Sequence, residues 1–139
     1  MNQITTQYVT EGGACYEQYV ITDPAAKTAL TITPERGGMI TGFTLDGDEY
    51  IWTRRPNFSE CNRPRFGVPV LFPSCGNPDG GVHLFDGKAY PMECHGFADL
   101  CAWEVESVGP DGVTLILEST PLTKFLYPFD FTLLSNYDL

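Results

Sequence analysis

Apolar and polar residues alternate with a period of two along most of this chain, in short runs separated by glycine and proline. In residues 102–108, for example, Trp103 and Val105 alternate with Glu104 and Glu106. Successive side chains of a strand point to opposite faces of a sheet, so this pattern is typical of half-buried β-strands. No run has the 3.6-residue period of an amphipathic helix. We therefore expect an all-β chain.

Turn residues separate the alternating runs and predict antiparallel connections. The expected strands are residues 16–22, 29–33, 39–45, 49–53, 83–85, 88–90, 102–108, 113–119 and 130–139. Two connections contain Asp-Gly, at residues 46–47 and 86–87, and both residue types tolerate the positive φ of a tight hairpin. A chain of 139 residues has the usual size of one domain. The pattern therefore predicts a single antiparallel β-sandwich over residues 1–139.

Composition and charge narrow the possible partners. The sequence is 42% hydrophobic and 13% aromatic, which is typical of a globular protein. Its formal net charge of −10 argues against nucleic acid or an anionic membrane as a partner, because both require clustered Lys and Arg. Residues 1–13 lack the features of a signal peptide, and no segment approaches the ~18 apolar residues of a membrane helix. These features predict a cytoplasmic protein with no nucleic-acid or membrane partner.

The cysteines indicate neither a disulfide framework nor a metal site. There are five of them, at irregular positions: Cys15, Cys61, Cys75, Cys94 and Cys101. An odd number suits reduced thiols in the cytosol, and no Cys-x-x-Cys pair offers the usual zinc-ligand spacing. We expect buried thiols, no metal and no cofactor.

Most of the unusual chemistry lies between residues 63 and 105, with His95 as the leading candidate. A histidine can donate and accept protons near neutral pH, which suits general acid–base catalysis. Gly96 beside it is expected to leave room for a ligand near the backbone. The alternative is a core histidine bonded to a backbone carbonyl. His83, on an expected hairpin arm, is interpreted as a surface residue.

Three motifs in this stretch resemble the aldose 1-epimerase (galactose mutarotase-like) family by their order and spacing. They are VPVLFP at residues 68–73 followed by a glycine-rich loop, DGKAYPM at residues 86–92, and HGFA at residues 95–98 before a Trp-containing strand. The resemblance spans residues 28–139 and implies about the first half of a galactose mutarotase-like supersandwich. It also implies an isomerase that interconverts the α and β anomers of an aldohexose, without metal or organic cofactor.

The resemblance implies a role for each partner in the reaction. In the family, a glutamate removes the proton of the anomeric hydroxyl, and the histidine of HGFA protonates the ring oxygen. Carried over to this sequence, that catalytic histidine is His95. The family's second histidine and its glutamate lie in the later half. Here the glutamates after His95 are Glu104, Glu106 and Glu118, at positions expected to face solvent.

Two arginines common among relatives are replaced in this chain. Asn77 stands where many relatives have an arginine just after the loop glycine, and Asp99 stands where relatives have the arginine of HGFAR. We expect Asn77, Asp99 and Arg65 to bind substrate; the alternatives are a turn role for Asn77 and a surface position for Arg65. The missing arginines and the acidic charge favour a neutral aldose over a sugar phosphate.

The two tryptophans, Trp52 and Trp103, lie in alternating strands. Tryptophan there is usually a core anchor, and stacking on a sugar face is the alternative.

Other interpretations of the whole chain remain open. The alternating run 130–139 reaches the last residue without a turn signal, which suggests either a natural edge strand or a truncated chain. We expect these residues alone to be an incomplete enzyme. The alternatives to an isomerase are a non-catalytic carbohydrate-binding module and a β-sandwich interaction protein with no sugar site.

Overall fold

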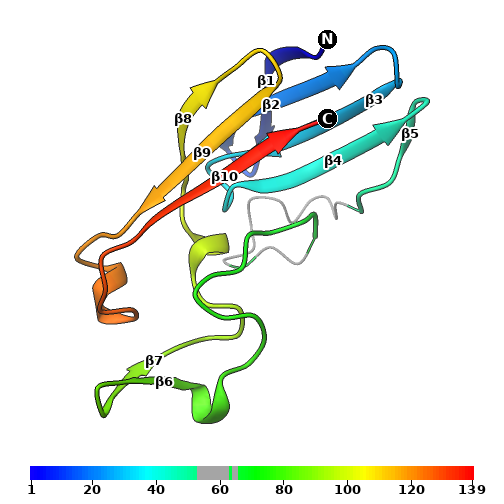
Figure 1. The fold of residues 1–139 in the computed structure, drawn as a ribbon. Coiled ribbons are helices and arrows are strands. Elements are labelled where there is room, and N and C mark those ends of the chain that lie inside the picture. Colours follow the sequence, from blue (N-terminus) through cyan, green and yellow to red (C-terminus); the bar gives the residue numbers. More distant parts are fainter. Residues whose placement is uncertain (53–62, 64–65) are drawn as a thin grey trace.

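Two antiparallel sheets dominate the computed structural model, which describes residues 1–52, 63 and 66–139 (Figure 1). The larger sheet follows chain order: β1 (Gln3–Glu11), β2 (Ala14–Asp23), β3 (Thr28–Thr33), β4 (Met39–Leu45) and β5 (Asp48–Glu49). The smaller sheet has the order β10-β9-β8 and comprises β8 (Glu104–Val108), β9 (Gly112–Glu118) and β10 (Thr132–Asp138). The prediction of an all-β, antiparallel fold is confirmed.

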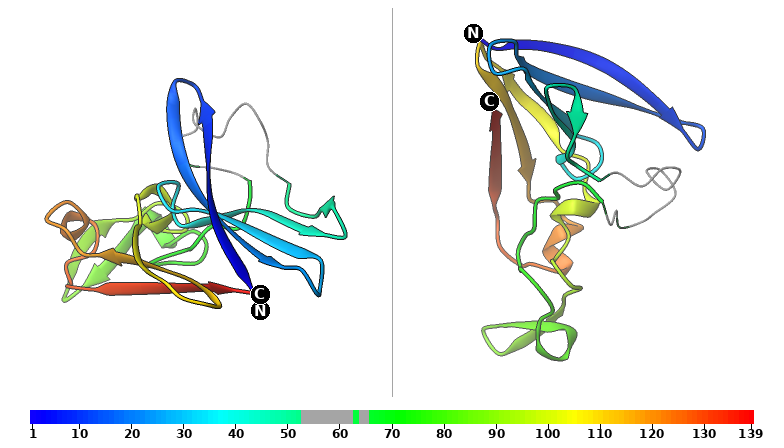
Figure 2. Two further views of the ribbon diagram at one scale, coloured as in Figure 1. Left: turned by 90° about the horizontal axis from the view of Figure 1, so that it is seen from above. Right: turned by 90° about the vertical axis from the view of Figure 1, so that its right-hand side faces the viewer.

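The two sheets lie against each other (Figure 2), and the hydrophobic core lies between them. The larger sheet contributes Ile21, Leu30 and Ile32, and the smaller sheet contributes Val113, Leu115, Leu117 and Tyr137. Alternate residues of β9 are buried, as expected for a strand with one face on a core. Two sheets that share such a core form a β-sandwich.

Most predicted strands are present, with two differences. β1 pairs along its whole length with β2, from Gln3 opposite Thr22 to Glu11 opposite Ala14, and it was not predicted. All of its side chains are exposed or half-buried, so it lacks a buried apolar face that the sequence could reveal. The strand expected at residues 49–53 is shorter, since β5 ends at Glu49; Thr53 lies outside the described residues.

A small third element stands apart from both sheets. The hairpin of β6 (Val82–Phe85) and β7 (Lys88–Pro91) confirms the predicted Asp-Gly turn and lies away from the sandwich (Figures 1 and 2). Its Phe85 ring contacts the rings of Tyr127 and Phe129 at centroid distances of 5.5 and 5.1 Å. These edge-to-face contacts attach the hairpin to the connection between β9 and β10.

Helical structure in the described part of the chain is limited to three single 3₁₀ turns, Asp79–Gly81, Ala98–Leu100 and Thr123–Phe125. Among the described residues, no helix has the length and apolar character needed to cross a membrane.

The turn between β3 and β4 anchors the segment that leads into β8. Pro34 O accepts hydrogen bonds from the N–H groups of Gly38 and Trp103, both at 3.0 Å, and Gly37 N–H donates to Cys101 O at 3.0 Å. The Tyr137 hydroxyl of β10 donates to Gly38 O. Both sheets therefore hold the connection that carries the HGFA motif.

Candidate functional site

Two of the motifs, far apart in sequence, are joined by backbone hydrogen bonds. Val68 pairs with Ile40 of β4, with N–H to O distances of 3.1 and 2.9 Å. Four residues later, Phe72 O accepts hydrogen bonds from the N–H groups of Phe97 and Ala98, at 2.8 and 3.2 Å. The VPVLFP segment therefore runs from β4 to the HGFA turn and holds that turn against the sandwich.

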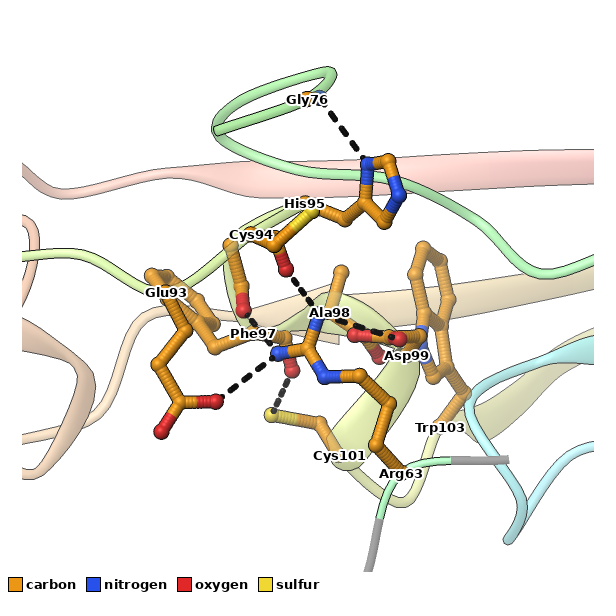
Figure 3. Close-up of polar contacts among 11 residues, drawn as sticks. Arg63, Gly76, Glu93, Cys94, His95, Phe97, Ala98, Asp99, Cys101 and Trp103 are labelled. Atoms are coloured by element: carbon orange, nitrogen blue, oxygen red, sulfur yellow. Dashed lines mark hydrogen bonds and ion pairs between the residues drawn. The ribbon is translucent and has the colours of Figure 1, made fainter. Parts of the chain in front are cut away.

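His95 is held from the other side by the glycine-rich loop. Its N–H donates to Gly76 O at 2.9 Å, and Gly76 N–H donates to its Nδ1, also at 2.9 Å (Figure 3). Nδ1 must carry a lone pair to accept this bond, so the neutral ring has its proton on Nε2. The loop thereby sets both the position and the tautomer of the imidazole.

Gly96 does not leave room for a ligand, contrary to the expectation from the sequence. A Cβ built on Gly96 would lie 2.2 Å from Phe72 O and 2.6 Å from Pro73 Cδ. The space that the missing side chain leaves is thus filled by the neighbouring chain. The glycine is required for backbone packing and for its φ of 77°.

Asp99 is almost completely buried in the 3₁₀ turn after the motif, with 3% of its surface exposed. Burial raises the pKa of its carboxyl group, and Arg63, whose Nη1 lies 3.6 Å from Oδ2, partly opposes that shift. The other oxygen, Oδ1, is buried and has no hydrogen-bond partner among the described residues. A buried polar atom without a hydrogen-bond partner is uncommon in folded proteins.

These groups line a pocket of about 540 Å³. One part of its wall is apolar or aromatic: Tyr50, Ile51, Trp52, Phe66, Gly67, Pro69 and Leu71. The other part is formed by Arg63, Cys94, His95 and Asp99. A mostly apolar pocket with a few convergent polar groups is the usual form of a small-molecule site.

The candidate residues from the sequence differ in their positions. His95 and Asp99 line this pocket together. Asn77 is exposed and is not among the residues that line it. Arg65 lies outside the described residues. Arg63 was not singled out from the sequence, in which its only distinguishing feature is that Arg65 lies two residues away.

The two tryptophans have opposite environments. Trp103 is a core anchor, 3% exposed, and its Nε1 donates to Ala98 O at 3.0 Å. Trp52 is 66% exposed and lines the pocket, so the interpretation of Trp52 as a core residue was wrong. His83, expected at the surface, is half-buried with its ring 5.8 Å from that of Phe85.

The expectation of buried thiols was also wrong for the cysteines that the structure describes. Cys15 and Cys75 are exposed, while Cys94 and Cys101 are half-buried, and all four are free. Burial raises the pKa of the Cys101 thiol. Within the described ranges, no group of three or more histidine, cysteine or acidic side chains could hold a metal ion.

Comparison with solved structures identifies proteins of the same fold. The Slr1438 protein of Synechocystis sp. PCC 6803 is 29% identical, with a TM-score of 0.83 over 100% of this chain and 48% of that chain. A galactose mutarotase related enzyme from Lactobacillus acidophilus is 27% identical, with a TM-score of 0.74 over 88% of this chain and 39% of that chain. A galactose 1-epimerase from Lactobacillus acidophilus NCFM shares the fold at 15% identity, with a TM-score of 0.72 over 100% of this chain and 44% of that chain.

No protein-family model matches the sequence. A search of the curated proteins gives no match either. The chain spans less than half the length of the solved structures that it resembles. The resemblance to galactose mutarotase-like proteins is nevertheless confirmed in the fold: these 139 residues match a little under half of such a β-sandwich.

Proposed function

We propose that this chain forms the histidine-bearing part of an aldose 1-epimerase-like isomerase, which interconverts the α and β anomers of a neutral aldose. The observation that carries this proposal is the placement of His95, whose Nδ1 accepts a hydrogen bond from Gly76 in a pocket with an aromatic wall. That arrangement leaves a proton on Nε2 of a fixed, neutral ring. A fixed donor of this kind can stabilise negative charge that develops on a substrate oxygen.

In the proposed reaction, a base removes the proton of the anomeric hydroxyl, the C1–O bond becomes a carbonyl, and the bond from C1 to the ring oxygen breaks. His95 Nε2–H donates a hydrogen bond to the ring oxygen and stabilises the negative charge that this oxygen gains. After rotation about C1–C2, the oxygen attacks the carbonyl again and the base returns its proton, which closes the ring to the other anomer. The base is the glutamate that the family resemblance implies; Glu104, Glu106 and Glu118 are exposed and do not line the pocket.

The surroundings of Arg63 support a neutral substrate. Its guanidinium already lies 3.4 Å from Glu93 and 3.6 Å from Asp99, so its charge is balanced within the protein. A phosphate would find no unpaired cation among the described lining residues. The Asp99 carboxyl group, which lines the same pocket, is the proposed partner of a sugar hydroxyl, and Trp52 offers a face for stacking on the ring.

Asn77 and Arg65 remain proposed substrate-binding residues on the strength of the sequence alone. Asn77 follows Gly76, whose backbone holds His95, so a hydroxyl contact there would require the ligand to extend to the exposed loop.

Sugar titrations of the 139-residue chain test the substrate class. Galactose and glucose should shift the NMR signals of His95 and Trp52, with little dependence on salt, whereas glucose 6-phosphate should bind more weakly. Tighter, salt-sensitive binding of the phosphate would overturn the neutral-sugar assignment. A His83→Asn variant is the matched control, because His83 is not among the pocket residues.

Polarimetry on freshly dissolved α-glucose tests catalysis, first with this chain and then with the chain combined with the remaining part of a relative's sandwich. In an active preparation, His95→Asn should reduce the rate by ~100- to 10,000-fold while His83→Asn leaves it unchanged. Binding without acceleration in either preparation would instead favour a carbohydrate-binding module, the second candidate, which the exposed Trp52 also suits. Acceleration by residues 1–139 alone would place the base within them.

A further inference from the structure

The backbone around His95 has an unusual conformation. His95 has a φ of 70° and Gly96 a φ of 77°, so two consecutive residues adopt the left-handed region. Glycine does this readily, but a residue with a side chain rarely does unless its surroundings impose it. Some contact must therefore hold this turn, because its shape decides where the imidazole points.

The Arg63 side chain supplies that contact from outside the turn. Its Nη1 donates to Cys94 O (Figure 3), and its Nη2 donates to Gly96 O at 2.6 Å. These carbonyls belong to the residues immediately before and after His95. Arg63 is 31 residues from Cys94 and 33 from Gly96 in sequence, and its side chain is 19% exposed. One planar guanidinium thus bridges the turn on both sides of the histidine.

Two acidic residues beside Arg63 balance the charge of its guanidinium. Glu93 Oε2 lies 3.4 Å from Nη2, and Asp99 Oδ2 lies 3.6 Å from Nη1. Both distances are longer than the 2.6 Å bond to Gly96 O. The carboxylates therefore act mainly through charge, while the carbonyls receive the short hydrogen bonds.

We propose that Arg63 is a positioning residue for His95: by bridging the carbonyls of Cys94 and Gly96, it holds the left-handed turn in which Nδ1 meets Gly76 N–H. The effect of this positioning on the reaction rests on the proposed function. The positioning of His95 by Arg63 does not depend on that function. Lysine cannot replace this arginine, because a single ammonium group lacks the planar pair of donors.

A sugar-free NMR experiment on the ¹⁵N-labelled chain tests the proposal. The sequence has two histidines, so His83 serves as an internal reference. In Arg63→Lys, the Gly76 amide should exchange with solvent about 3- to 10-fold faster, the range expected for loss of one hydrogen bond. The His95 ring nitrogens should move toward the shifts of an imidazole that averages between two tautomers. The His83 signals should stay in place.

Two further variants test whether His95 is positioned by the bonds of Arg63 to the two carbonyls or by an ion pair. Asp99→Asn removes one carboxylate and keeps both carbonyls, so the Gly76 exchange rate and the His95 ring shifts should change much less than in Arg63→Lys. Lys124→Gln removes a different paired cation, 2.5 Å from Asp130, and should leave them unchanged. If Arg63→Lys does not fold, Arg63→Met combined with Asp99→Asn removes the bridge without leaving a buried charge unpaired, and the same changes at Gly76 and His95 are expected.

The proposal would be overturned if Arg63→Lys kept the wild-type exchange rate of the Gly76 amide and the wild-type shifts of the His95 ring nitrogens. The same holds for the double variant if it is needed. Equal changes in Asp99→Asn would also overturn it, since the ion pair would then position the histidine. No sugar is present in this experiment, so neither result bears on the proposed isomerase activity, which is tested separately by polarimetry.

Discussion

Replacing Gly96 with alanine should destabilise the protein far more than the same change at a glycine of similar conformation elsewhere. The Cβ of Gly96→Ala would lie 2.2 Å from Phe72 O, a backbone atom that cannot move aside as a flexible side chain would. That oxygen accepts hydrogen bonds from the N–H groups of Phe97 and Ala98. The substitution therefore forces apart the contact that joins VPVLFP to the HGFA turn.

The expected loss of unfolding free energy has two parts. Alanine at a φ of 77° costs about 1–2 kcal/mol. Displacing Phe72 O weakens two hydrogen bonds, each with a net contribution of about 0.5–1.5 kcal/mol. Together these contributions predict a loss of about 2–5 kcal/mol for Gly96→Ala.

Urea denaturation followed by the fluorescence of buried Trp103 measures this loss. With a slope of about 1–3 kcal/mol per molar urea, a loss of about 3 kcal/mol lowers the midpoint by about 1–3 M. Gly87→Ala is the matched control: Gly87 has a φ of 75°, and a Cβ there meets nothing within 4 Å. It should lose only the conformational part, about 1–2 kcal/mol. Equal losses in the two variants would refute the argument that Phe72 occupies the space beside Gly96.

Three other substitutions test the polar contacts by chemical denaturation. Tyr137→Phe leaves Gly38 O without its hydroxyl donor, and Thr33→Val removes the oxygen that accepts from Gln18 Nε2 at 2.9 Å. Each should lower the unfolding free energy by about 1–3 kcal/mol, and a change within ~0.3 kcal/mol would contradict the proposed pairing. For Asp99, burial raises the pKa above 3.8, so the folded chain holds this proton more tightly than the unfolded chain does. The stability of the wild type relative to Asp99→Asn should therefore fall as pH rises above 3.8, and a relative gain between about pH 3.5 and pH 7 would contradict that shift.

Strands were predictable wherever one of their faces is buried. Val113, Leu115 and Leu117 of β9 pack into the core at every second position, and the sequence shows that spacing directly. β1 has no such face, because most of its residues are exposed. Its strand conformation comes from pairing with β2, and a pairing partner is not visible in a local pattern.

The candidate site was predictable only in part. The motifs singled out His95 and Asp99, which the structure brings to one pocket. Arg63 could not be chosen over other arginines, because its contacts are with residues 31 and 33 positions away. Trp52 shares an alternating pattern with core residues, yet it is 66% exposed, since β5 ends before it.

The sequence by itself determined the all-β class, the Asp-Gly hairpins and the motif that carries the histidine, because strand alternation and turn preferences are properties of neighbouring residues. Only the tertiary structure decided what surrounds that histidine. The pairing of Val68 with Ile40 and the contact of Phe72 with the HGFA turn bring the glycine-rich loop, Arg63 and Asp99 to His95. Such contacts depend on how two sheets pack and where their connections cross, which no local stretch of sequence specifies.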